Sequence, residues 1–212
     1  MKYPVEKSIF DNNPFKWEWY DRDYFMSKDG NGEYPSNHCK NTYIESLPYI
    51  TKKRNAVDIG CRDGEYTRYL HHDFQHVFCF DYRRRKLFHN NVDLNKITHF
   101  KCGLADANKT EYVSGGGSMT TGKIPKEKWY LEQLYTLDEF NLKDIDYMKI
   151  DVDGYELKVL QGSINTINKY WPLLVIEQEN NEQSAIQFCK NLGYELVAWS
   201  PNKQNVIMRK PT

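Results

Sequence analysis

Two acidic side chains follow an apolar stretch late in the chain, where Tyr147-Met-Lys-Ile-Asp-Val-Asp-Gly-Tyr-Glu156 contains Asp151 and Asp153. The pattern predicts a strand followed by a helix, and open α/β sheets bind their ligands at the carboxyl ends of strands. A carboxylate at such a site can accept the proton of a hydroxyl group or hold that hydroxyl in place. Asp151 is therefore the first candidate catalytic residue. Strand alternation puts Lys149 on the same face as Asp151, where its charge would lower the pKa of a nearby carboxylate.

Asp153 and Glu177 complete the set of candidate catalytic residues. Asp153 fits two roles equally, because Asp153-Gly-Tyr-Glu156 also matches a capping box with Asp153 as the N-cap of the helix. Glu177 ends the apolar run 173–176, so it is expected at the same sheet edge, where it can bind acceptor hydroxyls. Three carboxylates close together would suit a divalent cation. A metal site formed by Asp151, Asp153 and Glu177 is therefore a hypothesis.

A second turn that could bind a ligand lies about ninety residues earlier, in Asp58-Ile-Gly-Cys-Arg-Asp-Gly64. Its glycines let the backbone turn sharply and approach a ligand closely. Asp81 ends the next predicted strand about 20 residues later, where an acidic side chain can accept hydrogen bonds from the hydroxyls of an adenosine ribose. The candidate cofactor-binding residues are Asp58, Gly60, Cys61, Gly64, Asp81, Tyr82, Leu104 and Asp106.

The glycine spacing and the charge of this turn distinguish between two cofactors. A nicotinamide dinucleotide calls for G-x-G-x-x-G, and Asp58 and Asp63 would place negative charge beside its phosphates. S-adenosyl-L-methionine carries a sulfonium and an amino group, both cationic, so it suits an acidic turn better. A turn without any ligand is the alternative. Asp106 follows the third predicted strand, where it either accepts from the adenine amine, with Leu104 packed on the ring, or is a surface acid.

Alternating strand and helix patterns from residue 56 onward predict one α/β domain with a parallel sheet covered by helices. The predicted strands are 56–59, 77–80, 97–102, 147–150 and 173–176, followed by a closing antiparallel pair at 194–199 and 205–208. Helices are predicted at 39–49, 65–71, 83–92, 154–170 and 184–192, and a hairpin or loop containing three glycines at 110–119.

Residues 1–50 have a different composition from the domain predicted for 51–212. They are polar and rich in aromatic residues, including Trp17, Trp19 and Tyr20, and form an extension that either covers the acceptor or packs on the core. Over the whole chain, 29 basic residues balance 29 acidic ones, which argues against a nucleic-acid partner. No apolar run is long enough to span a bilayer, the start lacks a secretory signal, and five cysteines without paired spacing favour the cytoplasm.

Both turns together resemble the FkbM family of S-adenosylmethionine-dependent methyltransferases. The segment 57–67 is similar to that family's D-x-G-x-x-x-G-x-Y-T, and 136–162 to its T-L-D-x-[LF] followed by K-I-D-V-E-G-x-E-x-x-V-L-x-G. This chain differs at Asp153 and Asp81, where Glu is usual, and at Cys61-Arg62, where Ala-Asn is usual. The resemblance implies a doubly wound, mostly parallel seven-stranded sheet of Rossmann-like type with a closing antiparallel strand.

The same resemblance implies methyl transfer to a hydroxyl of a sugar, glycan or small metabolite, with that acceptor as the partner. One alternative is a nucleic-acid methyltransferase, but the Asn/Asp-Pro-Pro-Tyr and Pro-Cys motifs of base methylation are not in the sequence. A non-catalytic binding module that keeps the fold is the other alternative. The identity of the acceptor and the oligomeric state are left open.

Overall fold

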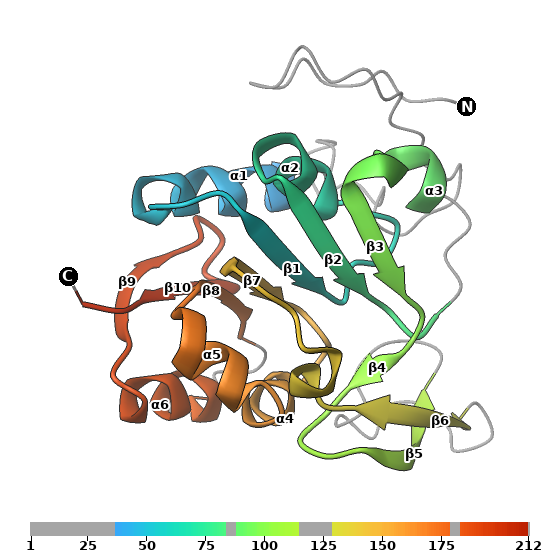
Figure 1. The fold of residues 1–212 in the computed structure, drawn as a ribbon. Helices are drawn as coiled ribbons and strands as arrows, with labels where there is room; N and C mark the ends of the chain where they lie inside the picture. Colours follow the sequence, from blue (N-terminus) through green and yellow to red (C-terminus); the bar gives the residue numbers. More distant parts are fainter. Residues whose placement is uncertain (1–36, 84–87, 115–128, 179–182, 212) are drawn as a thin grey trace.

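The computed structural model describes residues 37–83, 88–114, 129–178 and 183–211, drawn in colour in Figure 1. Outside the described residues lie Trp17, Trp19 and Tyr20 of the predicted extension, the three-glycine loop at 115–117 and residues 84–86. Within the described residues, no helix is both long enough and apolar enough to cross a membrane.

A seven-stranded sheet forms the centre of the molecule, with strand order β3-β2-β1-β7-β8-β10-β9 (Figure 1). Neighbouring strands from β3 to β8 are parallel, whereas β10 runs antiparallel to both β8 and β9. The sequence prediction of a mostly parallel seven-stranded sheet with an antiparallel closing pair is thus confirmed. The strands are β1 Asn55–Ile59, β2 His76–Phe80, β3 Ile97–Phe100, β7 Ile145–Ile150, β8 Leu173–Glu177, β9 Glu195–Trp199 and β10 Asn205–Arg209.

Helices cover both faces of this sheet, as the alternating pattern predicts. One face packs against α1 (Asn37–Ser46), α2 (Thr67–Asp73) and α3 (Phe88–Asn91), through a cluster that includes Tyr43, Leu70, Phe88 and Tyr147. The other face packs against α4 (Glu156–Gln161), α5 (Ile164–Tyr170) and α6 (Ser184–Asn191), through Leu160, Ile167, Ile186 and Met148. Three short 3-10 helices lie at Leu47–Tyr49, Leu94–Lys96 and Leu137–Phe140.

A small second sheet stands beside the carboxyl edge of the large one, with order β4-β6-β5 (Figure 1). Its strands are β4 (Gly103–Leu104), β5 (Lys109–Ser114) and β6 (Trp129–Tyr135), and β5 and β6 form an antiparallel pair. The hairpin or loop predicted at 110–119 covers most of β5, whereas β6 lies outside it and was not predicted as a strand. Val113 and Leu134 pack against Tyr155, which immediately precedes α4. The small sheet therefore forms one wall of the region where both glycine turns end.

The predicted single helix over 154–170 is wrong, because two helices, α4 and α5, occupy this range. Between them Gly162 approaches the main chain of β4 so closely that a Cβ would lie 1.9 Å from the carbonyl oxygen of Ala105. The second helix has its own start, where the Asp138 carboxylate accepts the N–H groups of Asn165 and Thr166, both at 2.9 Å. The Asp of the T-L-D segment and the glycine that ends the long motif thus fix where the two helices divide.

Candidate active site

The two glycine turns meet in one cleft at the carboxyl ends of β1, β2 and β7. Its volume, including the open mouth, is about 630 Å³, within the range of small-molecule and cofactor sites. The lining combines apolar, aromatic and charged side chains from five segments of the chain. The lining residues are Ile59, Gly60, Arg62, Phe80, Asp81, Tyr82, Arg83, Cys102, Gly103, Leu104, Leu134, Asp151, Val152, Asp153 and Tyr155.

Main-chain contact joins the two turns directly. Gly60 has a left-handed φ of 86°, and a Cβ at this position would lie 1.8 Å from the carbonyl oxygen of Asp151. In the other direction, the Asp151 N–H donates to the Ile59 carbonyl at 2.9 Å. Only glycine fits at position 60, both for its conformation and for its space. The predicted cofactor turn and the predicted acceptor turn are therefore parts of one rigid backbone unit.

Asp58 is the buried anchor of the first turn. The Thr67 hydroxyl, in the first turn of α2, donates to its Oδ2 at 2.5 Å. Burial raises the pKa of Asp58 to about 6, although the Thr67 hydrogen bond and the charge of Lys149 work against the shift. Cys61 is buried beside it, and the Gly64 N–H donates to the Cys61 carbonyl at 2.8 Å. Asp58, Cys61 and Gly64, all predicted to bind the cofactor, support the turn from its buried side and do not line the cleft.

Asp81 lies at the cleft wall, where the ribose-binding prediction requires it. Its Oδ2 accepts the Arg62 N–H at 3.1 Å, and its Oδ1 accepts the Arg83 N–H at 2.8 Å. Each carboxylate oxygen has two lone-pair positions, so the side chain can accept further hydrogen bonds from a ligand while it stays oriented by the backbone. Asp81 thus ties the turn after β1 to the turn after β2.

Tyr82 and Leu104 also line the cleft, on either side of Gly103 in the lining. A Cβ on Gly103 would lie 2.6 Å from Leu134 and 3.5 Å from the Tyr82 ring, so this wall is tightly packed. Asp106 lies outside the lining residues. Its carboxylate accepts from the Lys109 ammonium at 2.8 Å on the small sheet.

Opposite charges and paired carboxyls dominate the second turn. Lys149 is 2% exposed, and its ammonium lies 2.9 Å from the Asp151 carboxylate, as strand alternation predicts. Burial alone would raise the pKa of Asp151, but the Lys149 charge and the hydrogen bonds with Glu177 and Lys149 together outweigh it, and the pKa falls to about 2. Burial acts to lower the pKa of Lys149, but the Asp151 and Glu177 carboxyls outweigh it and leave that pKa raised.

The pKa of Glu177 shifts in the opposite direction to that of Asp151. Burial, and then the negative charge of Asp151, raise the pKa of Glu177 to about 10. Two carboxyls that share one site cannot both ionise easily, so one keeps its proton while the other is charged. At neutral pH the cluster therefore consists of an ammonium, a carboxylate and a protonated carboxyl.

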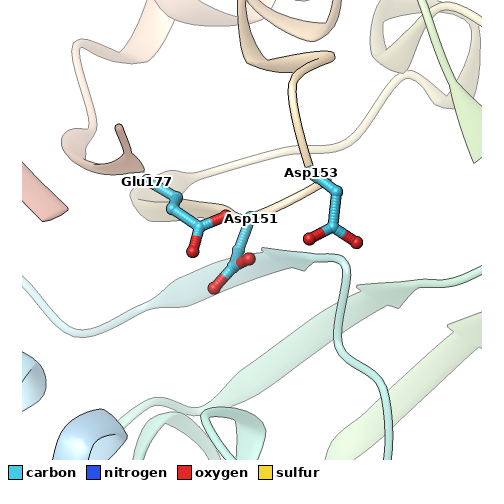
Figure 2. A group of neighbouring side chains, drawn as sticks. All are labelled: Asp151, Asp153 and Glu177. Carbon is cyan, nitrogen blue, oxygen red and sulfur yellow. The ribbon is translucent and has the colours of Figure 1, made fainter. Parts of the chain in front are cut away.

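Figure 2 shows Asp151, Asp153 and Glu177 gathered at the sheet edge, each offering a carboxylate oxygen within 4.8 Å of the others. The sequence hypothesis of a cation site thus has its three side chains close together. Two of them already have their charge compensated, Asp151 by Lys149 and Glu177 by its own proton. Asp153 is half-exposed and lies 3.7 Å from the Arg83 guanidinium. The Lys149 ammonium beside Asp151 and the Arg83 guanidinium near Asp153 thus already supply positive charge to this cluster.

The predicted capping box differs from the observed one. The N-cap of α4 is Tyr155, and Asp153 has a left-handed φ of 54°, two residues before that cap. Glu156 does reach back, as a capping-box Glu does, because its Oε1 accepts the N–H groups of Val152 at 3.0 Å and Gly154 at 3.2 Å. The Glu156 side chain therefore holds the turn in shape, while Asp153 remains at the cleft.

Sequence reasoning missed several lining residues. Arg62 and Arg83 are adjacent to predicted residues, so the positions flanking the two turns could have indicated them. Tyr155 and Leu134 lie in the cleft because the small sheet docks on the start of α4, and no local pattern signals that packing.

S-adenosyl-L-methionine fits the residues present. Gly60 leaves room for close approach of a ligand to the backbone, and Asp81 presents an oriented carboxylate for ribose hydroxyls. The aromatic and apolar wall of Tyr82 and Leu104 suits an adenine ring, and the cleft is large enough for the whole molecule.

Solved structures support the fold. An FkbM methyltransferase from Methylobacillus flagellatus KT has a TM-score of 0.54 and 16% identity, covering 74% of this chain and 43% of its own. This chain thus spans less than half of that protein. SMU.1697c from Streptococcus mutans, solved in complex with SAH, has a TM-score of 0.51 and 13% identity, covering 80% of this chain and 98% of its own.

Precorrin 8W decarboxylase from Methanobacterium thermoautotrophicum has a TM-score of 0.51 and 14% identity, covering 81% of this chain and 89% of its own. Comparison with curated proteins gives no significant match. The architecture is accordingly that of the Rossmann-like methyltransferases, with the cleft at the carboxyl edge of the sheet. The chain belongs to the methyltransferase FkbM domain family, whose model matches residues 34–198. The family and the fold expected from the sequence motifs are both confirmed.

Proposed function

We propose that this methyltransferase uses S-adenosyl-L-methionine to methylate a hydroxyl group of a sugar, glycan or small metabolite. The observation that carries the proposal is the direct contact between Gly60 and Asp151, which line the same cleft, with the Lys149 ammonium paired to the Asp151 carboxylate behind it. Gly60, Asp81, Tyr82 and Leu104 would hold the cofactor, supported by Asp58, Cys61 and Gly64. When bound, the cofactor supplies a methyl group on a sulfonium.

Asp151 holds the acceptor hydroxyl in this proposal. Its pKa of about 2 keeps it ionised at all physiological pH values, but it also makes the carboxylate a weak base. The carboxylate therefore accepts a hydrogen bond from the hydroxyl and fixes its direction. Since an in-line displacement depends chiefly on alignment, this positioning supplies most of the rate increase. The hydroxyl becomes strongly acidic only as its new bond forms, so a weak base suffices for the proton.

Lys149 and Glu177 keep Asp151 in that state. Lys149 fixes the Asp151 carboxylate by a buried ion pair, and Glu177, protonated at neutral pH, offers a hydroxyl donor and a carbonyl acceptor beside it. Asp153 lies at the mouth of the cleft beside Arg83, where it contacts the acceptor. The five free thiols suit the reducing cytoplasm.

Binding and turnover test the proposal separately. Calorimetry with S-adenosylmethionine, S-adenosylhomocysteine and NAD should detect binding of the first two and no binding of NAD. Transfer of a labelled methyl group should then appear with a panel of polyols and glycosides, and not with DNA or RNA. Failure to bind the first two ligands contradicts the proposal, whereas binding without transfer to any hydroxyl compound identifies a non-catalytic module.

A further inference from the structure

The proposed hydroxyl site continues along the sheet edge beyond Glu177, to a side chain that neither the sequence motifs nor the cleft include. Asn205 begins β10 and lies directly opposite Glu177 in the antiparallel pair of β8 and β10. Residues paired in this way have their Cβ atoms about 5 Å apart and their side chains on the same face of the sheet. The Asn205 side chain therefore lies beside the Glu177 carboxyl.

Sheet alternation confirms which face this is. The inward neighbours Val175 on β8 and Ile207 on β10 belong to the same core cluster as Tyr147, two residues before Lys149. Since side chains alternate along a strand, Lys149, Glu177 and Asn205 all project toward the face covered by α1 and α2. Together with Asp151, they form a polar row across the ends of three adjacent strands, β7, β8 and β10.

Asn205 is fully buried, yet its carboxamide has no bonding partner. Its exposure is 0%, and among the described residues neither Oδ1 nor Nδ2 has a hydrogen-bond partner; the same holds for Oε2 of Glu177. The backbone of Asn205 is in contrast fully used, since its N–H donates to the Ser200 hydroxyl at 2.9 Å and its carbonyl accepts the Ser200 N–H at 2.8 Å. An unpaired buried amide is costly, which favours a partner that the ligand-free structure lacks; because its polar atoms are covered, neighbouring side chains must move for a hydroxyl to reach them.

The available groups define the ligand chemically. A carboxamide offers one donor side and one acceptor side, and the neighbouring Glu177 carboxyl adds acceptor oxygens, so together they can bind a hydroxyl. An anionic group would face Asp151 and Asp153, and a cationic group would compete with the buried Lys149 ammonium. Asn205 and Asp151 stand two strand spacings apart, about 10 Å, which a six-membered polyol ring bridges with one hydrogen bond at each end.

From this row we infer that Asn205 and Glu177 form a second hydroxyl-binding subsite, which selects acceptors that carry further hydroxyls beside the one methylated at Asp151. The inference rests on the proposed function and narrows its substrate class to cyclic polyols and sugars. Asn205 contacts no reacting atom, and its role is to set specificity.

The test compares Asn205→Leu with the wild type, using myo-inositol, methyl α-glucopyranoside and the monodeoxy derivatives of the glucoside as probes. The wild type should favour the full glucoside over at least one deoxy derivative, and the variant should lose this preference. The KM for the glucoside should rise about fivefold to tenfold, as expected for one lost hydrogen bond. The kcat and the affinity for S-adenosylhomocysteine should remain unchanged.

A stability measurement separates this role from a structural one and needs no activity. Because the carboxamide has no protein partner, Asn205→Leu should leave the melting temperature of the ligand-free protein unchanged or raised. The matched control is Asn55→Leu at the opposite edge of the sheet, where the amide donates to the Lys143 carbonyl at 2.8 Å. That change should lower the melting temperature and leave acceptor preference intact. If Asn205→Leu does not fold, Asn205→Ala serves for the same kinetic comparison.

Two results overturn the inference. One is that the Asn205 variants keep the wild-type preference for the full glucoside and the wild-type KM, which would mean that the amide binds no acceptor hydroxyl. The other is a lowered melting temperature with unaltered preference, which would make Asn205 structural. Absence of transfer by the wild type to every probe contradicts the proposed function instead, and calorimetry with myo-inositol on protein saturated with S-adenosylhomocysteine then still tests the subsite. Binding weakened in Asn205→Leu supports it, and equal binding contradicts it.

Discussion

The turn after β1 and the turn after β7 have similar backbones but treat their carboxylates differently. Both use left-handed residues, Gly60, Arg62 and Gly64 in the first and Asp153 and Gly154 in the second. In the first turn, Asp58 accepts from Thr67, and Asp81 accepts from two backbone N–H groups. In the second, the charged side chains face one another. The comparison suggests that the first turn contributes mainly a backbone shape to the cleft, whereas the second contributes charged side chains.

Asp151→Asn should have the largest effect, because it removes charge from the second turn without changing its shape. We expect methyl transfer to fall by about 10²-fold to 10⁴-fold, with cofactor affinity nearly unchanged, since the amide orients a hydroxyl poorly beside Lys149. Steady-state kinetics and calorimetry measure the two quantities. Asp146→Asn, at the other end of the same strand, is the control, because its carboxylate binds Arg54 far from the cleft. Loss of cofactor binding in Asp151→Asn would contradict the assignment of the second turn to the acceptor alone.

Gly60→Ala should break the comparison altogether, because it acts on the backbone contact that both turns share. The added Cβ would lie 1.8 Å from the Asp151 carbonyl oxygen. We expect a loss of about 3 kcal/mol or more in the free energy of unfolding, together with loss of cofactor binding. Thermal denaturation and calorimetry check both. An alanine variant with normal stability would show that the turns are not rigidly joined.

Asp81→Ala should affect the first turn alone. It leaves the Arg62 and Arg83 N–H groups without their acceptor and removes the proposed ribose contact. Cofactor affinity should fall about tenfold or more, while kcat at saturating cofactor stays close to that of the wild type. Asp93→Ala is the control, since this aspartate caps a 3-10 helix away from the cleft. A kcat that falls more than the affinity would mean that the two turns are assigned in the wrong order.

The pH dependence of stability tests the charge states proposed for the second turn. Folded Glu177 keeps its proton up to about pH 10, whereas the unfolded chain releases it near the usual 4.5, so the folded state loses stability as pH rises between these values. Glu177→Gln cannot ionise, and its melting temperature should exceed that of the wild type by a margin that grows from pH 5 to pH 9.

Glu156→Gln is the matched control for this measurement. Burial raises the pKa of Glu156 only to about 7, so the pH-dependent margin should stop growing near that pH. Equal pH profiles for the two variants would contradict the shared proton at the Asp151–Glu177 pair.

Exhaustive chelation should have the smallest effect. Because Lys149 and the Glu177 proton already compensate the cluster, we expect the transfer rate to remain unchanged in EDTA. A rate that falls with chelation and returns with Mg²⁺ or Mn²⁺ would restore the metal hypothesis for Asp151, Asp153 and Glu177.

Sequence patterns predicted the sheet, because its strands are short, mostly apolar segments that alternate with helical segments. They also predicted that Lys149 and Asp151 share a face, which requires only strand alternation. The break at Gly162 was missed, since it depends on contact with Ala105 in a distant strand. Asn205 was missed for a similar reason: its position beside Glu177 follows from the pairing of β8 with β10, which no local pattern encodes.

The contact between Gly60 and the Asp151 carbonyl has a consequence for how such an enzyme can diversify. The contact holds the two turns together through main-chain atoms, which substitutions at other side chains do not alter. Under the proposed function, acceptor preference could then change through positions such as 177 and 205 while the two turns keep their relative placement. A change of substrate in this scaffold then requires only new side chains along the sheet edge, with position 60 kept as glycine.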